Sequence, residues 1–157
     1  PRLAQLAAGF KARYEADAQK PFLAAVATLN QSYVANGIGR ARAAAQQKGT
    51  LEEVTALDAE KARIQSGQPL PPADLETLPA SLKGLRATYR GALAKIEADR
   101  AQKAAPLYDL YIGALNAYVT ELTKANKIDD AQKVKTLRDD IAAQKPQVDA
   151  AVATLFP

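Results

Sequence analysis

The sequence predicts an all-α protein of two antiparallel hairpins, each with a long and a shorter helix, forming an elongated four-helix arrangement. Alanine supplies much of the apolar content of 48%, while aromatic residues make up only 6%, and alanine has the highest helix propensity. Apolar residues recur in steps of three and four, and no segment alternates convincingly as a strand would. The two halves of the chain also match each other, which indicates a duplicated unit.

An N-terminal stripe of apolar residues, from Leu3 to Tyr33, predicts one long amphipathic helix. Pro21 lies inside the stripe, and an interior proline removes a backbone hydrogen bond and clashes with the preceding turn. We therefore expect either a kink or two shorter helices there. The segment from Asn36 to Gly39 is a second weak point, because each glycine costs about 1 kcal/mol relative to alanine. The helix is expected to bend or loosen there.

The end of this helix and the start of the next are marked by local signals. Gly49 suits the left-handed position just past a helix C-terminus. The segment from Thr50 to Glu53 fits a capping box, in which both side chains bond to backbone amides. We expect the new helix to end near Ser66 and Gly67, and its apolar face to consist of Leu51, Val54, Leu57, Lys61 and Ile64.

A proline-rich stretch separates the two hairpins. Its first half cannot be regular helix, whereas Pro79 is well placed near the start of a helix. Pro106 interrupts the following helix, with a kink as one outcome. We assign residues 1–66 to the first hairpin, 67–78 to a linker, 79–145 to the second hairpin and 146–157 to a C-terminal helical tail.

The second hairpin is the clearer one. A short break from Lys124 to Lys127 joins its two helices, which must therefore fold back antiparallel. The apolar stripe of the first helix consists of Tyr108, Tyr111, Leu115, Tyr118 and Leu122, and that of the second consists of Ile128, Ala131, Val134, Leu137 and Ile141. These stripes are predicted to bury each other.

The two halves of the chain match at their tyrosines and at the acidic residues that begin their shorter helices. Tyr14 and Tyr33 correspond to Tyr89 and Tyr108, and Leu51-Glu52-Glu53 corresponds to Ile128-Asp129-Asp130. Acidic residues in a first turn complement the helix dipole, which explains both pairs structurally. The turn is also similar to that of tetratricopeptide helix pairs, but the repeat of about 34 residues is not met.

The stretch from Leu82 to Ile141 resembles an uncharacterised helical module of predicted exported bacterial proteins, often found beside carbohydrate-recognition or sulfatase-related domains. The stretch from Phe10 to Ile64 resembles it more loosely, and departs from it at Pro21 and from Asn36 to Gly39. The resemblance implies no catalytic residues, a periplasmic or extracellular location, and proteins or flanking domains of the same precursor as partners.

Composition narrows the possible chemistry. Histidine, cysteine, methionine and tryptophan are absent, which excludes zinc fingers, thiol nucleophiles, Ser-His-Asp relays and imidazole-ligated haem. The adjacent pairs Asp129-Asp130 and Asp139-Asp140 could serve a metal or acid-base chemistry. Neighbouring helical positions point about 100° apart, so a solvated or dipole-complementing role is favoured. We assign no catalytic residue, cofactor or metal.

Charge argues against a nucleic-acid partner, and hydropathy argues against a membrane-spanning helix. The 21 basic and 17 acidic residues are interspersed, so the net charge of +4 does not indicate a nucleic-acid footprint. No apolar run approaches the roughly 20 residues needed to span a bilayer. The sequence does not specify an oligomeric state.

The six tyrosines allow two interpretations. They could line a groove for a sugar or peptide, or they could pack in the helix seam, which is favoured because they lie on the apolar stripes. Tyr111 and Tyr118 have no tyrosine counterpart in the first half, and are the residues expected to contact a ligand or partner.

Together these features predict a non-catalytic structural or protein-interaction module, a spacer or scaffold, in an exported bacterial protein. The alternative is a ligand-binding helical bundle with a tyrosine-lined cleft for a glycan or small molecule. A third hypothesis is an adaptor that binds acidic partners through its net positive charge.

Overall fold

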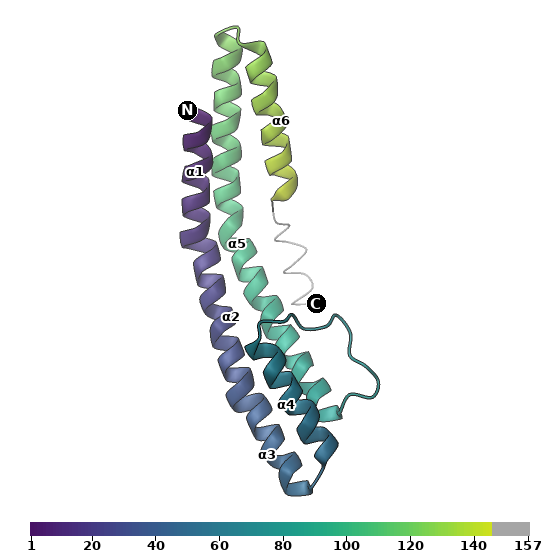
Figure 1. Ribbon diagram of the computed structural model, residues 1–157. Helices are drawn as coiled ribbons and strands as arrows, with labels where there is room; N and C mark the ends of the chain where they lie inside the picture. The colour runs from purple at the N-terminus through teal and green to yellow at the C-terminus, as the bar shows by residue number, and fades with distance from the viewer. Residues whose placement is uncertain (146–157) are drawn as a thin grey trace. The chain divides into compact units, whose positions relative to one another are not determined.

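The computed structural model describes residues 1–145, which are helical apart from two tight turns and one connecting loop (Figure 1). The all-α class is therefore confirmed for these residues. The predicted C-terminal tail, residues 146–157, lies outside them. The first helical stretch runs without interruption through α1 (Arg2–Tyr14), η1 (Glu15–Gln19), α2 (Lys20–Ser32), η2 (Tyr33–Ile38) and α3 (Gly39–Lys48); α4 (Leu51–Gln65), α5 (Ala80–Lys124) and α6 (Ile128–Gln144) follow.

Pro21 neither ends nor divides the first helical stretch, because a π-helical segment, η1, immediately precedes it. The backbone N–H of Lys20 donates to the carbonyl of Glu15, five residues back. A π turn is wider than an α turn, so it leaves room for the proline ring where an α turn would clash with it.

The predicted weak point from Asn36 to Gly39 overlaps a second π-helical segment, η2, where the N–H of Gly39 donates to the carbonyl of Val34. A Cβ placed on Gly37 would lie 3.2 Å from Cδ2 of Leu85 in α5. Gly37 therefore lets α5 approach more closely than a larger residue would allow.

Substitutions of two glycines, Gly37 and Gly84, should differ in their effect because of this contact. Gly84→Ala should raise the free energy of unfolding by about 0.5–1 kcal/mol, since alanine favours helix and its Cβ would meet no atom within 4 Å. Gly37→Ala has the same propensity gain but must displace Leu85. Urea unfolding should show a smaller gain, or a loss, for Gly37→Ala, and equal gains would contradict the close contact.

The turns agree with the sequence, but the predicted capping box does not form. Gly49 has a left-handed φ of 71°, and Asn126, in the second turn, has a φ of 56°. Thr50 is the N-cap of α4, yet its side chain makes no capping hydrogen bond. The Glu53 carboxylate instead accepts a hydrogen bond from the hydroxyl of Ser81 in α5. A tertiary contact has thus replaced the local one.

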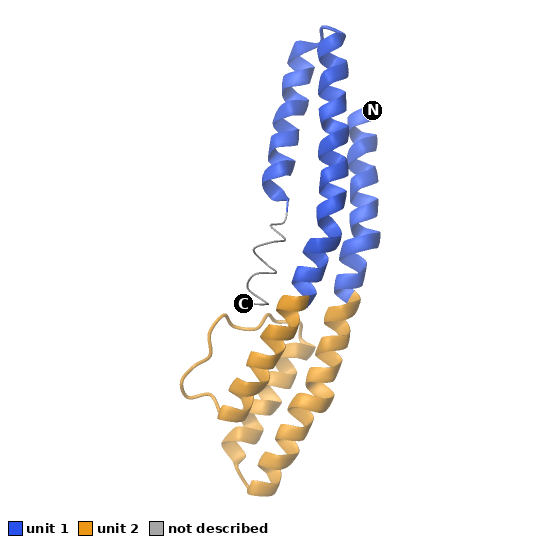
Figure 2. Cartoon of the chain, turned by 180° about the vertical axis from the view of Figure 1, so that it is seen from behind, with its two compact units in different colours: residues 1–23, 96–157 blue, residues 24–95 orange. Residues whose placement is uncertain are grey.

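Contacts divide the described residues into two compact units, 1–23 with 96–145 (unit 1) and 24–95 (unit 2) (Figure 2). Unit 1 contains α1, the later part of α5, and α6, whereas unit 2 contains most of α2, α3, α4 and the first part of α5. Each unit therefore draws on both predicted hairpins, and the contacts do not follow the predicted division at residues 67–78.

Each unit has its own apolar core. In unit 1 the buried residues are Tyr111, Leu115, Leu122, Ala131 and Val134, and Leu3, Leu6 and Phe10 of α1 pack against them. In unit 2 they are Tyr33, Ile38, Ala45, Leu57, Leu82 and Tyr89. The stripe of α5 is thus buried by α1 as well as by α6.

Two residues assigned to the apolar stripes are exposed. Leu51 is 76% exposed and Ile128 is 44% exposed, although both were expected to face a partner helix. Each is the first residue of its helix, directly after a turn, and helical side chains tilt toward the N-terminus. Their side chains therefore reach past the end of the packed region.

Pro106 is accommodated inside α5, which continues to Lys124. Neither α5 nor any other helix within residues 1–145 is both long enough and apolar enough to cross a membrane.

Candidate functional site

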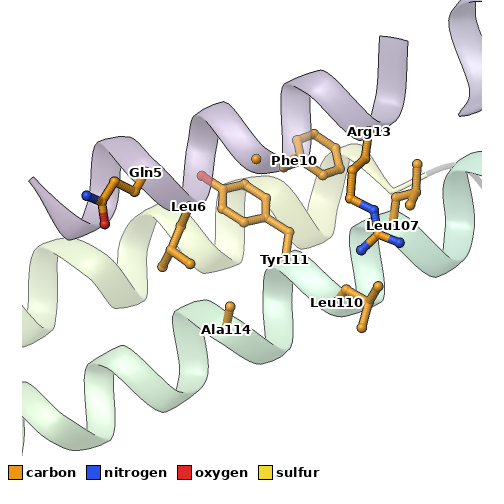
Figure 3. A pocket seen from close by; sticks show the side chains of 9 residues that line it. Gln5, Leu6, Phe10, Arg13, Leu107, Leu110, Tyr111 and Ala114 are labelled. Atoms are coloured by element: carbon orange, nitrogen blue, oxygen red, sulfur yellow. The ribbon is translucent and has the colours of Figure 1, made fainter. Parts of the chain in front are cut away.

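Tyr111 and Tyr118, the residues predicted to contact a ligand, both belong to unit 1 but do not form one site. Tyr111 is buried, and its ring stacks on that of Phe10 with the centroids 4.8 Å apart. It also lines a hollow between α1 and α5 (Figure 3). Tyr118 does not line this hollow; the guanidinium of Arg2 lies 5.1 Å above its ring.

The hollow has a volume of about 240 Å³. Its wall is mostly apolar, and Figure 3 shows the ring of Tyr111 reaching from α5 toward α1. The polar residues of the wall are Gln5 and Arg13, and the apolar ones include Leu6, Phe10, Leu107, Leu110, Tyr111 and Ala114. Such a surface can bind apolar groups.

The remaining tyrosines pack within the two units. In unit 1 the ring of Tyr108 meets Phe10 edge-on at 5.0 Å and Tyr14 at 6.4 Å. In unit 2 the buried rings of Tyr33 and Tyr89 are 4.9 Å apart. The Tyr89 hydroxyl donates to Oδ1 of Asn30 at 2.7 Å. These five aromatic residues therefore serve helix contacts, as the packing interpretation expects.

Sequence reasoning missed the most strongly charged site, which lies in unit 2 around Glu60 of α4. This residue is only 2% exposed. Its Oε1 accepts hydrogen bonds from the Tyr33 hydroxyl at 2.9 Å and from Nη2 of Arg63 at 2.7 Å. Its Oε2 accepts one from Nη2 of Arg86 at 2.7 Å and one from Nε of Arg63 at 3.2 Å. The buried carboxylate is therefore fully partnered.

The network continues into the proline-rich loop through Asp74. Nη1 of Arg86 lies 3.2 Å from Oδ1 of Asp74, and Arg90 donates to both oxygens of this carboxylate at 2.8 and 3.1 Å. Arg90 also donates to the carbonyl of Pro71, and Arg63 to that of Gln68. The predicted linker is thus fastened to α4 and α5 by three arginines.

The ionisation of these groups reflects their surroundings. Burial alone would raise the pKa of Glu60, but hydrogen bonds from Arg63, Arg86 and Tyr33 outweigh it and lower the pKa to about 2. The hydrogen bond from Arg90, opposed by desolvation and aided by Arg86, lowers the pKa of Asp74 to about 2. Burial, followed by the charge of Glu60, raises the pKa of the Tyr33 hydroxyl. These shifts favour an anionic Glu60 and a neutral Tyr33.

The lowered pKa values predict a loss of stability in acid. Both carboxyls have a pKa of about 2 when folded and about 4 when unfolded. Their contribution is therefore present above about pH 4 and is lost as the pH falls toward about 2. Urea midpoints measured from about pH 5 to about pH 2 should fall, and Asp74→Asn should reduce the drop. A reduction of equal size in Asp17→Asn, an exposed residue outside the network, would contradict this assignment.

The sequence pattern of α4 contained a signal for this site, but the wrong residue was placed on the buried face of the helix. The stripe of α4 was predicted to pass through Lys61, which is exposed, whereas the neighbouring Glu60 is buried. Glu60 follows Leu57 by three positions and precedes Ile64 by four. This three-and-four spacing places the Glu60 carboxylate on the same helix face as Leu57 and Ile64. Together with Arg63 nearby, it indicates a buried ion pair.

The paired aspartates do not assemble a metal site with other residues. No group of three or more histidine, cysteine, aspartate or glutamate side chains that could hold a metal ion occurs within the described part of the chain. Asp129 and Asp130 occupy the first turn of α6, and Asp139 accepts hydrogen bonds from Arg138 beside it.

Comparison of the chain with protein-family models, with curated proteins and with solved structures found no match.

Proposed function

We propose that this chain is a non-catalytic helical module that acts as a structural or protein-interaction element, a spacer or scaffold, of an exported bacterial protein. The supporting observation is that the chemically versatile side chains are used to hold the chain together. Glu60 and Asp74 both pair with Arg86 within unit 2, and the Tyr33 hydroxyl donates to the Glu60 carboxylate. Groups bound in this way are poorly placed to act on a substrate.

The interaction role draws further support from apolar side chains that the cores do not use. Leu110 of α5 is 57% exposed and borders the hollow, and Leu23 of α2 is 56% exposed. Exposed apolar surface beside a groove is typical of protein contact sites. The exported location and the flanking domains as partners rest on the resemblance of Leu82 to Ile141 alone.

A second candidate function, the binding of a glycan or small molecule, is favoured by the position of Tyr111 in the hollow. Thermal shift measurements with a panel of sugars and small metabolites distinguish the two. We expect no saturable rise in Tm. A saturable rise that is lost in Gly9→Leu, which fills the hollow, but kept in Gly113→Leu, which lies outside it, would favour ligand binding and overturn the structural role.

A further inference from the structure

We propose that the hollow between α1 and α5 of unit 1 receives an amphipathic α-helix from another protein, with an apolar side chain in the hollow and a carboxylate paired to Arg13. This inference rests on the proposed protein-interaction function and specifies the chemistry of the partner.

The size of the hollow favours a side chain over a whole small molecule. Pockets for drug-sized ligands usually measure about 300–1,000 Å³ and enclose most of the ligand, whereas this hollow measures about 240 Å³. One of its walls, Leu110, is more than half exposed. A shallow apolar depression between two helices matches the way a third helix inserts its leucine or aromatic side chains.

The two helices provide contrasting surfaces at the hollow. On α5, Leu107 is 7% exposed and belongs to the interior, while Leu110, three positions later, is 57% exposed. On α1, a Cβ placed on Gly9 would meet no atom within 4 Å, so bare backbone borders the open space. A partner helix can therefore approach α1 closely at Gly9 and cover Leu110 at the same time.

Charge specifies the acidic character of the partner. Within residues 1–145, Arg13 makes no ion pair or hydrogen bond to another side chain, although it lines the hollow. Arg2 of the same helix is already paired with Glu121. Figure 3 shows the Arg13 side chain beside Leu107 at the edge of the hollow. A guanidinium in this position pairs well with a carboxylate near the apolar anchor of the partner.

A displayed library of helical peptides tests the proposal with the full chain. Each peptide carries a central leucine or phenylalanine as anchor, and the positions within one turn of it vary between glutamate and lysine. We expect selection of glutamate near the anchor, and affinities measured by fluorescence anisotropy should fall at least tenfold in Gly9→Leu. Arg13→Glu should reverse the preference to lysine.

Two matched variants control for folding and for general charge effects. Gly113→Leu makes the same substitution at an exposed helical glycine outside the hollow, and Arg40→Glu reverses the charge of an exposed arginine of unit 2. Both should leave the measured affinity unchanged.

Several outcomes would overturn the proposal. The hollow would be rejected as a binding site if no peptide were selected, or if glutamate and lysine were recovered equally. It would also be rejected if binding survived both Gly9→Leu and Arg13→Glu, although that result would still allow an interaction role elsewhere on the chain. If the chain self-associated and Gly9→Leu abolished this, the occupant of the hollow would be a second copy of the chain and not another protein. If Leu155→Asp increased peptide binding, the occupant would be the C-terminal segment of the chain. Saturable binding of a small carboxylate such as benzoate, lost in Arg13→Glu, would overturn both the groove and the proposed function.

Discussion

Replacing Glu60 with alanine should destabilise the protein by about 3–5 kcal/mol, the range typical of removing one partner from a buried ion pair. The substitution leaves Arg63 and Arg86 without their shared carboxylate, and it deprives the buried Tyr33 hydroxyl of its acceptor. Equilibrium unfolding in urea, followed by circular dichroism at neutral pH, measures the change in the free energy of unfolding.

Asp58→Ala is the matched control, because Asp58 lies on the same helix and also binds an arginine. Its pair with Arg42 is on the surface, with the two side chains 47% and 41% exposed, and solvent screens such pairs so that they contribute little to stability. A similar loss for both variants, or a loss below about 1 kcal/mol for Glu60→Ala, would contradict the buried network.

Replacing Leu115 with alanine should destabilise the protein by about 2–5 kcal/mol, as expected for a buried leucine that leaves a cavity. Leu115 is fully buried in the core of unit 1, where α6 and α1 surround it. The same urea titration measures the effect, and the helix propensity of alanine is high enough that α5 itself should persist.

Leu110→Ala provides the comparison on the same helix, five positions earlier. Because Leu110 is 57% exposed, its truncation creates no buried cavity and should cost well under 1 kcal/mol, within the range of roughly ±0.5 kcal/mol typical of surface substitutions. Comparable losses at the two positions would mean that the α5 stripe is not buried as the structure shows.

The helices and their ends were largely predictable because local interactions determine them. The three-and-four spacing identified both long helices, and Gly49 ended the first of them as expected. The break after Lys124 gave the second turn. The sequence left open whether Pro21 would kink or divide the first helix, and the π segment that carries the helix past this proline had no signal in the sequence.

The candidate site was predictable only in part. Tyr111 was selected from the sequence and does line the hollow, but the hollow also needs Gly9 and Leu110, which lie on opposite helices and carry no local signal. Tyr118 packs beneath Arg2, a residue 116 positions away in the chain. Contacts of this separation depend on how the long helices align.

The sequence by itself determined which segments are helical, where they turn and which faces are broadly apolar, since periodicity, propensity and turn residues act over a few positions. Only the tertiary structure decided that α1 packs on the later part of α5 and that Glu60, not Lys61, is buried. Adjacent positions on a helix differ by about 100°, so a small rotation set by distant partners chooses between them. The hollow beside Tyr111 and the arginine network around Glu60 both depend on how the helices are rotated against one another.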